Sequence, residues 1–250
     1  MAKRGIQGAI LKGLGARDRT ITVVGAEDIT ARFRRIWFHA ETLLNEIEVG
    51  PTAWLRLWIP DPNGGRAQYQ RAYTISEVGE EPGRFAADFV LHEPAGPASI
   101  WARSVSGGES LEVMSLGSSI FEIPAELPAG YLIVGDAASL PAINAVLRTI
   151  PAEVEIKVYL EQHDPLDQQI PMAKHPKAQI AWAERDDADT LAKAIESRDL
   201  TGWRVWAAAE SGSLKTLRTR LKGELGVPKS HAEIRAYWIE GKAMGNQWRG

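Results

Sequence analysis

The sequence contains no cysteine among its 250 residues. Disulfide bonds, iron–sulfur clusters and thiolate zinc sites are therefore excluded. Its five histidines show no pairing at metal-ligand spacing, so we expect no resident metal. A G-x-S-x-G elbow is also missing, which argues against a serine hydrolase. The segment "EQHDPLD", residues 161–167, is interpreted as a solvated loop rather than a metal cluster.

Long apolar runs are absent as well. No stretch approaches the ~20 residues that a membrane helix requires. The apolar run near the N-terminus is only "GAIL", which is too short for a signal-peptide core. A formal net charge of −3 gives no general attraction to nucleic acid or anionic lipid. We therefore expect a cytoplasmic monomer that binds neither nucleic acid nor a membrane.

The first half of the chain has the periodicity of β-strands. Between residues 20 and 123, alternating, β-branched and aromatic segments are separated by turn-forming clusters. The six expected strands read "TITVVGA", "ARFRRIWFHA", "AWLRLWIP", "AYTISEV", "RFAADFVLH" and "SLEVMSL". Six strands at short spacing predict a closed antiparallel barrel or a sandwich. One segment, "GPASIWARSVSGG", has helical spacing instead.

The second half changes rhythm near residue 129. Buried strands such as "GYLIVGD" and "GWRVWAAAE" alternate with amphipathic helices such as "SLKTLRTRLKGELG". This alternation predicts a parallel, doubly wound sheet. We expect an antiparallel six-stranded β-barrel domain over residues 1–123, followed by an α/β parallel-sheet domain over residues 124–250.

The stretch "QRAYTISEVG", residues 70–79, raises a chemical question. Strand alternation places Arg71, Tyr73 and Ile75 on one face and Ala72 and Thr74 on the other. A flavin needs cationic planar donors for its pyrophosphate, an aromatic or apolar wall for its ring, and a hydrogen-bonding neighbour near N5. An arginine could bind the pyrophosphate, a tyrosine could form the wall for the ring, and a threonine could be the hydrogen-bonding neighbour near N5. An ordinary edge strand with one exposed arginine explains the same residues, so this stretch alone does not decide.

A second segment, "DFVLHEPAGPASIWA" at residues 88–102, runs from a strand through a Gly-Pro turn into a helix. Free backbone N–H groups and the helix dipole make such a helix start an anion site. Pro97 suits the first turn, where its missing donor has no cost, and Ser99 adds a hydroxyl. A simple helix cap would look the same in isolation.

Four segments in the same order resemble the siderophore-interacting proteins, which are flavin-dependent ferric-siderophore reductases of the ferredoxin-reductase superfamily. They are "RAYTIS", "FVLHEPAGPASIWA", "YLIVGDAASLPAI" and "LRTRLKGELGVPKSHAEIRAYWIEG". Each segment alone is weakly specific, but together they extend over nearly the whole chain. The resemblance implies that the first domain is an FAD-binding barrel and that the second domain binds NAD(P)H.

The resemblance also implies roles for individual residues. In the first segment, Arg71 would contact the FAD phosphates, Tyr73 would lie against the ring and Thr74 would approach the flavin edge, where it is the candidate catalytic residue. The other expected cofactor-binding positions are Ala72, Asp88, Phe89, Val90, His92, Gly96, Pro97, Ala98 and Ser99. Of these, residues 88–92 would line the ring and ribityl chain with their backbone, and residues 96–99 would hold the pyrophosphate.

The sequence departs from the family at three basic positions. Ser76, Gly117 and Ile239 stand where the family often carries arginines. Basic residues near the last two positions help the family hold anionic siderophores, so the resemblance predicts a less positive chelate site here. Arg56, Lys242 and Arg249 are the residues expected to compensate by binding the substrate.

At the expected dinucleotide crevice of the second domain, "VGDAASLPAI" joins a strand end to a helix start. It is not a G-x-G-x-x-G fingerprint. Asp136 is either a helix cap or a cofactor contact, and Ser139 keeps a hydroxyl of the family motif. Glu210 matches a family glutamate at the same edge of the predicted sheet. The alternative interpretation is that Glu210 only caps the next helix. Arg185 could read a 2′-phosphate, but acids surround it, so NADH and NADPH both remain open.

The expected function is FAD-dependent reduction of a ferric siderophore in the cytoplasm, with NAD(P)H as the electron donor and release of Fe(II). Two alternatives remain. One is a flavin reductase of the same fold that uses another partner, such as a ferredoxin or a quinone. The other is a ferric-chelate-binding protein without redox activity.

Overall fold

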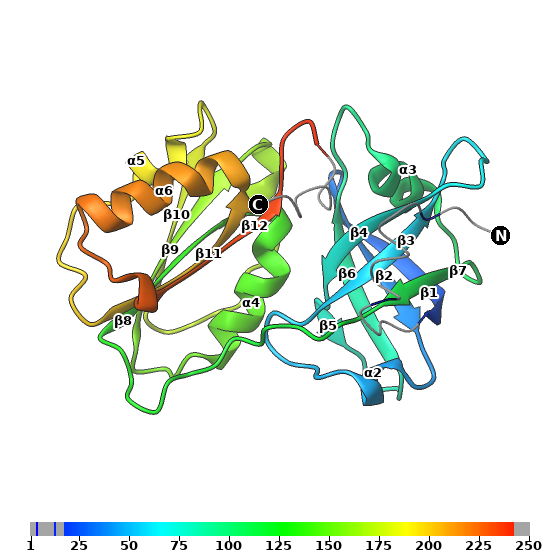
Figure 1. The fold of residues 1–250 in the computed structure, drawn as a ribbon, viewed down its shortest axis with the longest axis horizontal. Coiled ribbons are helices and arrows are strands. Elements are labelled where there is room, and N and C mark those ends of the chain that lie inside the picture. The colour runs from blue at the N-terminus through cyan, green and yellow to red at the C-terminus, as the bar shows by residue number, and fades with distance from the viewer. Residues whose placement is uncertain (1–3, 5–12, 14–17, 243–250) are drawn as a thin grey trace. The chain divides into compact units, whose positions relative to one another are not determined.

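A computed structural model describes residues 4, 13 and 18–242 of the chain. It divides into two compact units, Met1–Phe121 and Glu122–Gly250. The first unit, drawn from blue to green in Figure 1, is built mainly of β-strands, and the second combines a sheet with helices. Each unit is described on its own.

Among its described residues, the first unit is an antiparallel sheet of seven strands that is joined to two short helices. Its strand order is β4-β3-β7-β1-β2-β6-β5. The strands are β1 (Arg19–Thr30), β2 (Phe33–His39), β3 (Trp54–Pro60), β4 (Gln68–Thr74), β5 (Glu77–Val78), β6 (Arg84–Val90) and β7 (Ser110–Met114). The helices are α2 (Leu43–Glu46) and α3 (Pro97–Ser104). The predicted antiparallel barrel is confirmed, although it has seven strands where the sequence indicated six.

The additional strand arises because one expected strand, "AYTISEV", is split into β4 and β5. Between them the chain changes its pairing partner. Ile75 donates its backbone N–H to Ala53 beside β3 over 2.8 Å, and Ser76 donates to Ala86 on β6 over 2.9 Å. Because β4 and β5 stand at opposite ends of the strand order, this bend joins the two ends of the sheet and closes the barrel.

Aromatic side chains fill the barrel core, and α3 closes one end of it. The ring of Phe38 lies 5.4 Å from that of Phe85, and Trp101 of α3 lies 5.6 Å from Phe89 between ring centroids. All four are buried. Replacing a core aromatic of this kind by alanine typically costs about 3–5 kcal/mol. The helix is therefore held in place by the same core that stabilises the sheet.

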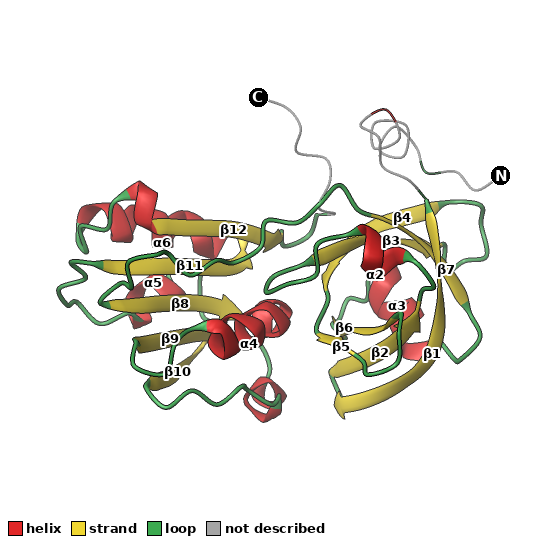
Figure 2. Cartoon of the chain, turned by 90° about the horizontal axis from the view of Figure 1, so that it is seen from below, coloured by secondary structure: helices red, strands yellow, loops and turns green. Residues whose placement is uncertain are grey.

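The second unit is a parallel five-stranded sheet of order β10-β9-β8-β11-β12, as predicted. The strands are β8 (Gly130–Asp136), β9 (Glu155–Gln162), β10 (Ala178–Glu184), β11 (Trp203–Glu210) and β12 (Ala232–Trp238). The helices are α4 (Leu140–Thr149), α5 (Thr190–Ala194) and α6 (Ser211–Gly223), with the 3₁₀ turns η1 (Ala137–Ser139), η2 (Pro165–Gln169) and η3 (Lys229–His231). Figure 2 shows α4 on one face of the sheet and α5 and α6 on the other.

The strand order places a topological switch beside β8, because the chain continues from β8 to β9 on one side and returns to β11 on the other. In open α/β sheets, ligands bind at the carboxyl ends of the strands at such a point. Across the described residues, no helix is long and apolar enough to cross a membrane.

Candidate functional sites in the two units

The strand β4 presents the predicted Arg-x-Tyr-Thr segment beside the barrel core. Arg71 and Tyr73 are half-buried and lie opposite the buried Leu57 and Leu55 of β3. One face of the Tyr73 ring is covered by Phe89, with 4.0 Å between centroids and 31° between planes. Burial raises the pKa of the Tyr73 phenol, and the nearby charge of Arg71 opposes that rise. The two side chains therefore share one side of the strand, as the alternation predicted.

The guanidinium of Arg71 is not engaged by a carboxylate. It donates to the backbone carbonyl of its neighbour Gln70 over 2.7 Å, and within the described residues no acid lies at ion-pair distance. On the other side of the strand, Ala72 is exposed and Thr74 is buried. Arg71 consequently keeps donors that can meet an anionic ligand.

The start of α3 fits an anion. Gly96 is the N-cap, Pro97 occupies the first turn, and no side chain caps the helix, so the first backbone N–H groups lack an intrahelical acceptor. The backbone N–H of His92 donates to Ser99 Oγ over 3.2 Å, which ties the preceding loop to the helix. Helix α3 packs against β3, β4 and β6. The structure thus brings the two predicted cofactor segments to one end of the barrel, where Figure 1 shows α3 beside β3 and β4.

The predicted residues on β6 divide between the two faces of the strand. Phe89 points into the core, whereas Asp88 forms a two-pronged ion pair with Arg35 over 2.7 and 2.9 Å. Ser76 donates its hydroxyl to the same carboxylate over 3.0 Å. Arg35 also pairs with Glu77 over 2.6 Å, so its guanidinium beside position 76 is already neutralised. The missing family arginine at Ser76 is therefore not replaced by a free cation at this point.

Arg56, a predicted substrate contact, lies on β3 directly opposite Ala72. Its guanidinium stacks over the Trp54 ring, 4.2 Å from the centroid. Burial lowers the pKa of Arg56, and no carboxylate pairs with it in the part of the chain that the structure describes. A half-buried guanidinium with only an aromatic partner can still bind an anion.

In the second unit, the carboxyl end of β8 holds Asp136 in a buried capping box. Its Oδ1 accepts the backbone N–H of Ser139 over 3.2 Å, and Ser139 Oγ accepts the N–H of Asp136 over 2.9 Å. Its Oδ2 accepts the indole N–H of Trp238, at the end of β12, over 2.7 Å. Burial raises the pKa of Asp136 to about 6, although the Trp238 hydrogen bond opposes that rise. The interpretation of Asp136 as a cap is confirmed, and its role toward a dinucleotide stays a prediction.

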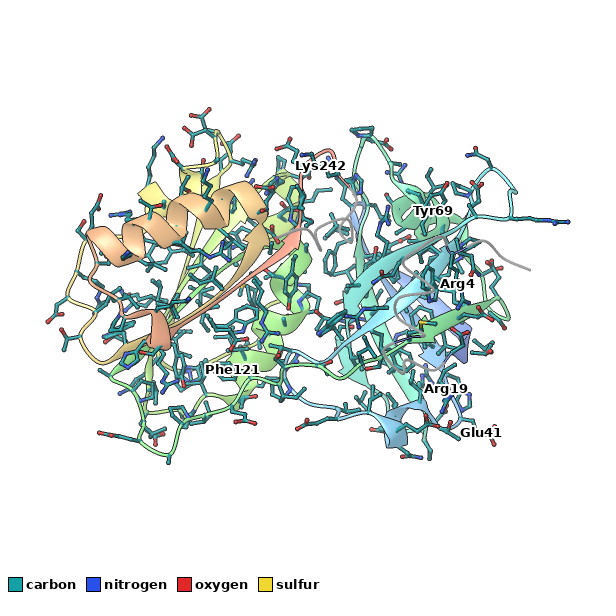
Figure 3. The ribbon with its side chains drawn as sticks, in the orientation of Figure 1. Arg4, Arg19, Glu41, Tyr69, Phe121 and Lys242 are labelled. Carbon is teal, nitrogen blue, oxygen red and sulfur yellow. The ribbon has the colours of Figure 1, made fainter. Side chains whose placement is uncertain are left out.

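Glu210, at the end of β11, is also a cap. Its side chain accepts the backbone N–H groups of Gly212 and Ser213 at the start of α6. Its other oxygen accepts the N–H of Glu240 over 3.2 Å. Lys242, labelled in Figure 3, is exposed in the turn that follows β12. Arg249 lies outside the described residues.

An ion-pair network around one buried glutamate occupies the same edge of the sheet, and the sequence did not predict it. Glu161, at the end of β9, is fully buried. It binds Arg185 over 2.7 Å, His163 over 2.9 Å and the Ser213 hydroxyl over 3.1 Å. Despite the opposing effect of burial, His163 and Arg185 lower the pKa of Glu161. The interpretation of "EQHDPLD" as a solvated loop was wrong, because Glu161 and Asp167 are both buried. The sequence signal that could have revealed this network was an acid at the carboxyl end of a parallel strand.

Comparison with known proteins identifies the fold and then the family. A siderophore utilization protein from T. fusca has a TM-score of 0.78 at 21% identity, with 91% of this chain and 94% of that one covered. A siderophore-interacting protein from Aeromonas hydrophila has a TM-score of 0.73 at 23% identity, over 90% and 93% of the two chains. Reductases such as the cytochrome b5 reductase domain of Ulva prolifera nitrate reductase share the arrangement at a TM-score of 0.63 and 14% identity, over 88% of this chain and 97% of that one. The chain has the two-domain fold of ferredoxin-reductase-like proteins.

Two family models match along the sequence. A siderophore-interacting FAD-binding domain matches residues 61–118, and a siderophore-interacting protein domain matches residues 128–241. The chain belongs to the siderophore-interacting protein family, and FAD is its cofactor. The open helix start at α3 and the uncommitted donors of Arg71 fit such a group.

Among curated proteins, the chain is 51% identical over 244 residues to the mycobactin import ATP-binding/permease protein IrtA of Mycolicibacterium smegmatis. That match covers 98% of this chain and only 28% of the relative, so the chain spans a little over a quarter of that protein's length. It is 28% identical over 181 residues to the ferric vibriobactin reductase ViuB of Vibrio cholerae, covering 69% of this chain and 65% of that one.

Proposed function

We propose that this chain is an FAD-dependent reductase of ferric siderophores that takes its electrons from NAD(P)H. The observation that carries the proposal is the pairing of an uncapped helix start at Gly96 with the Arg71–Tyr73 strand at one end of the barrel. In this assignment the domain over residues 1–123 holds FAD and the domain over residues 124–250 receives the dinucleotide. The protein is proposed to act as a cytoplasmic monomer.

When bound, FAD supplies the ability to accept a hydride and to pass on single electrons. The residues of the chain bind and orient it. Arg71 and the backbone N–H groups of Gly96, Ala98 and Ser99 would hold the pyrophosphate, because Arg71 has no carboxylate partner among the described residues and no side chain caps the helix start. The Tyr73 ring has one face against Phe89 and offers its remaining surface to the flavin. Thr74 supplies a hydroxyl at the end of the strand, near the position expected for the flavin edge.

The proposed substrate is a ferric chelate whose iron stays bound to the siderophore until it has been reduced. In the described residues no group of His, Cys, Asp and Glu side chains could hold a metal ion, which is compatible with iron that remains chelated. Two relatives are named for mycobactin import and for ferric vibriobactin reduction. By that likeness we propose a siderophore of the kind those proteins handle, contacted by Arg56 and Lys242. Fe(III) is reduced by one electron and leaves the chelate as the more weakly bound Fe(II).

Stopped-flow spectroscopy tests this proposal. The FAD-loaded protein is mixed anaerobically with NADH, NADPH or a reduced ferredoxin, and loss of flavin absorbance is followed. Ferric chelates are then added to the reduced protein. Reduction by a nicotinamide nucleotide and reoxidation by a ferric siderophore are expected. Reoxidation by quinones or ferredoxin but not by any ferric chelate would favour a flavin reductase with another acceptor. Protein that never takes up FAD would favour a chelate-binding protein.

A further inference from the structure

The carboxyl edge of the second sheet carries a row of charged residues that belongs to three neighbouring strands. Asp136 ends β8 and is aligned in register with Glu161 of β9. Arg185 follows β10 directly, and its backbone N–H donates to Gln162 of β9 over 2.9 Å. These residues therefore lie side by side where a parallel sheet binds its ligand.

Arg185 is surrounded by acids. Its guanidinium binds Glu161 over 2.7 Å and Glu240 over 3.3 Å, and it also donates to the Ser213 hydroxyl over 2.9 Å. The charge of Glu210 adds to this environment and contributes to raising the pKa of Arg185. Arg185 thus forms ion pairs with two carboxylates and feels the charge of a third, and His163 beside Glu161 is the other basic group of the cluster, so acids outnumber bases here.

The chemistry of the two nicotinamide donors differs at one group. NADPH carries a phosphate on the adenosine 2′-oxygen, whereas NADH carries a hydroxyl there. In dinucleotide-binding sheets an acid at the end of the second strand suits the hydroxyl, and a nearby free arginine suits the phosphate. In this unit β9 follows β8 in the chain. It carries an acid, Glu161, one residue before its end, and this acid is paired with the nearby Arg185.

We propose, on the basis of the function proposed above, that the second unit selects NADH over NADPH, and that Glu161 is the specificity-determining residue. Glu161 acts by holding Arg185 and by adding negative charge where the 2′-phosphate would lie. Like charges brought together in a partly buried site disfavour binding, so the discrimination rests on repulsion.

The test compares wild type with Glu161→Gln in the FAD-loaded protein. Glutamine keeps the size of the side chain and an oxygen acceptor for Arg185 and Ser213, but it removes the charge. Glu155→Gln is the matched control, because Glu155 lies at the other end of the same strand and pairs with Arg198 over 3.3 Å. Flavin reduction by NADH and NADPH is measured by stopped flow, and binding of 2′,5′-ADP and 5′-AMP is measured by calorimetry.

Wild type is expected to prefer NADH and to bind 5′-AMP more tightly than 2′,5′-ADP. Glu161→Gln should raise the NADPH-to-NADH ratio of kcat/KM roughly tenfold, the size expected for removing one like charge from beside a phosphate. It should strengthen 2′,5′-ADP binding to a similar extent, while Glu155→Gln changes neither quantity. If Glu161→Gln does not fold, Glu240→Gln is measured instead, because Glu240 is exposed. This variant should shift the NADPH-to-NADH ratio of kcat/KM in the same direction by a smaller amount.

NADPH used as well as NADH by wild type would overturn this inference alone. Flavin reduction by neither nucleotide would overturn both the inference and the proposed electron donor. Unchanged ratios in both Glu161→Gln and Glu240→Gln would overturn the role of Glu161.

Discussion

The arginines of the barrel unit differ in the groups that their guanidinium groups already bind. Arg35 is neutralised by Asp88 and Glu77, whereas Arg71 donates to a carbonyl and Arg56 stacks on a ring. Only a guanidinium without a carboxylate partner can give its full charge to a ligand. This difference makes Arg71 and Arg56 the better candidates for contacts with phosphate or chelate.

Replacing Arg71 by alanine tests the FAD assignment. A charge-assisted hydrogen bond contributes ~1.5–3 kcal/mol, so FAD affinity should fall roughly ten- to a hundredfold. Arg66→Ala is the control, because Arg66 is exposed in the turn that precedes the same strand. Fluorescence titration of the apoprotein with FAD measures both variants. Equal affinities for wild type and Arg71→Ala would mean that Arg71 is an ordinary strand residue.

Asp136 makes the stability of the second unit depend on pH. Its pKa is about 6 when folded, against 3.8 for an unperturbed aspartate. The folded state therefore binds the proton more tightly, and the associated stability is present below 3.8 and lost as pH rises through about 6. The difference corresponds to about 3 kcal/mol. The pKa of His163 is also raised, since its hydrogen bond to Glu161 and the charge of Asp136 outweigh burial, so its contribution is likewise lost as pH rises.

The expected result is a higher unfolding temperature for the second unit at pH 5.5 than at pH 8. Glu161 acts oppositely, but its lowered pKa confines its loss of stabilisation to pH values below about 4.5. Asp136→Asn should reduce the dependence between pH 5.5 and pH 8, because asparagine does not titrate and the His163 contribution is what remains. Thermal unfolding followed by circular dichroism gives both profiles. A wild-type unit that is more stable at pH 8 would contradict the assignment.

At the scale of elements, the turn from β8 to η1 depends on close packing around a glycine. A Cβ at Gly135 would lie 2.2 Å from Ser139 Oγ, 2.6 Å from Ile143 and 3.0 Å from the Ala208 carbonyl. Gly135→Ala should therefore destabilise the unit by about 1–3 kcal/mol or more. Gly223→Ala is the control at the end of α6, where a Cβ meets nothing within 4 Å. Urea unfolding should show a lower midpoint for the first variant and an unchanged or higher midpoint for the second.

For the molecule as a whole, the prediction concerns the charge of the chelate. The chain carries a net charge of −3, and Gly117 and Ile239 stand where the family carries arginines. Attraction between exposed charges is screened over ~8 Å at physiological salt. We expect turnover to depend weakly on ionic strength and to favour neutral or weakly charged hydroxamate chelates over triply anionic catecholates.

Turnover with one chelate of each type at low and high ionic strength checks this expectation. A catecholate that is clearly better at low salt and loses its advantage at high salt would contradict it. In that case basic residues such as Arg56 would supply the positive charge, and Arg56→Gln should weaken the salt dependence.

Local patterns in the sequence determined most of the secondary structure and the type of each sheet. Alternation and turn clusters predicted the strands of the barrel, and strand–helix alternation predicted the parallel sheet. The helix start at Gly96 and the caps at Asp136 and Glu210 were also readable, because a cap binds N–H groups only two or three residues away.

The tertiary structure alone decided which distant groups meet. Trp238 reaches Asp136 across 102 positions of sequence, and Arg35 reaches Asp88 across 53. The partners of Glu161 and the bend that closes the barrel at Ile75 and Ser76 belong to the same category. Such contacts depend on the register and order in which strands pair, and those follow from packing of the whole unit. Composition and periodicity describe one segment at a time, so they do not encode which carboxylate a given arginine will meet.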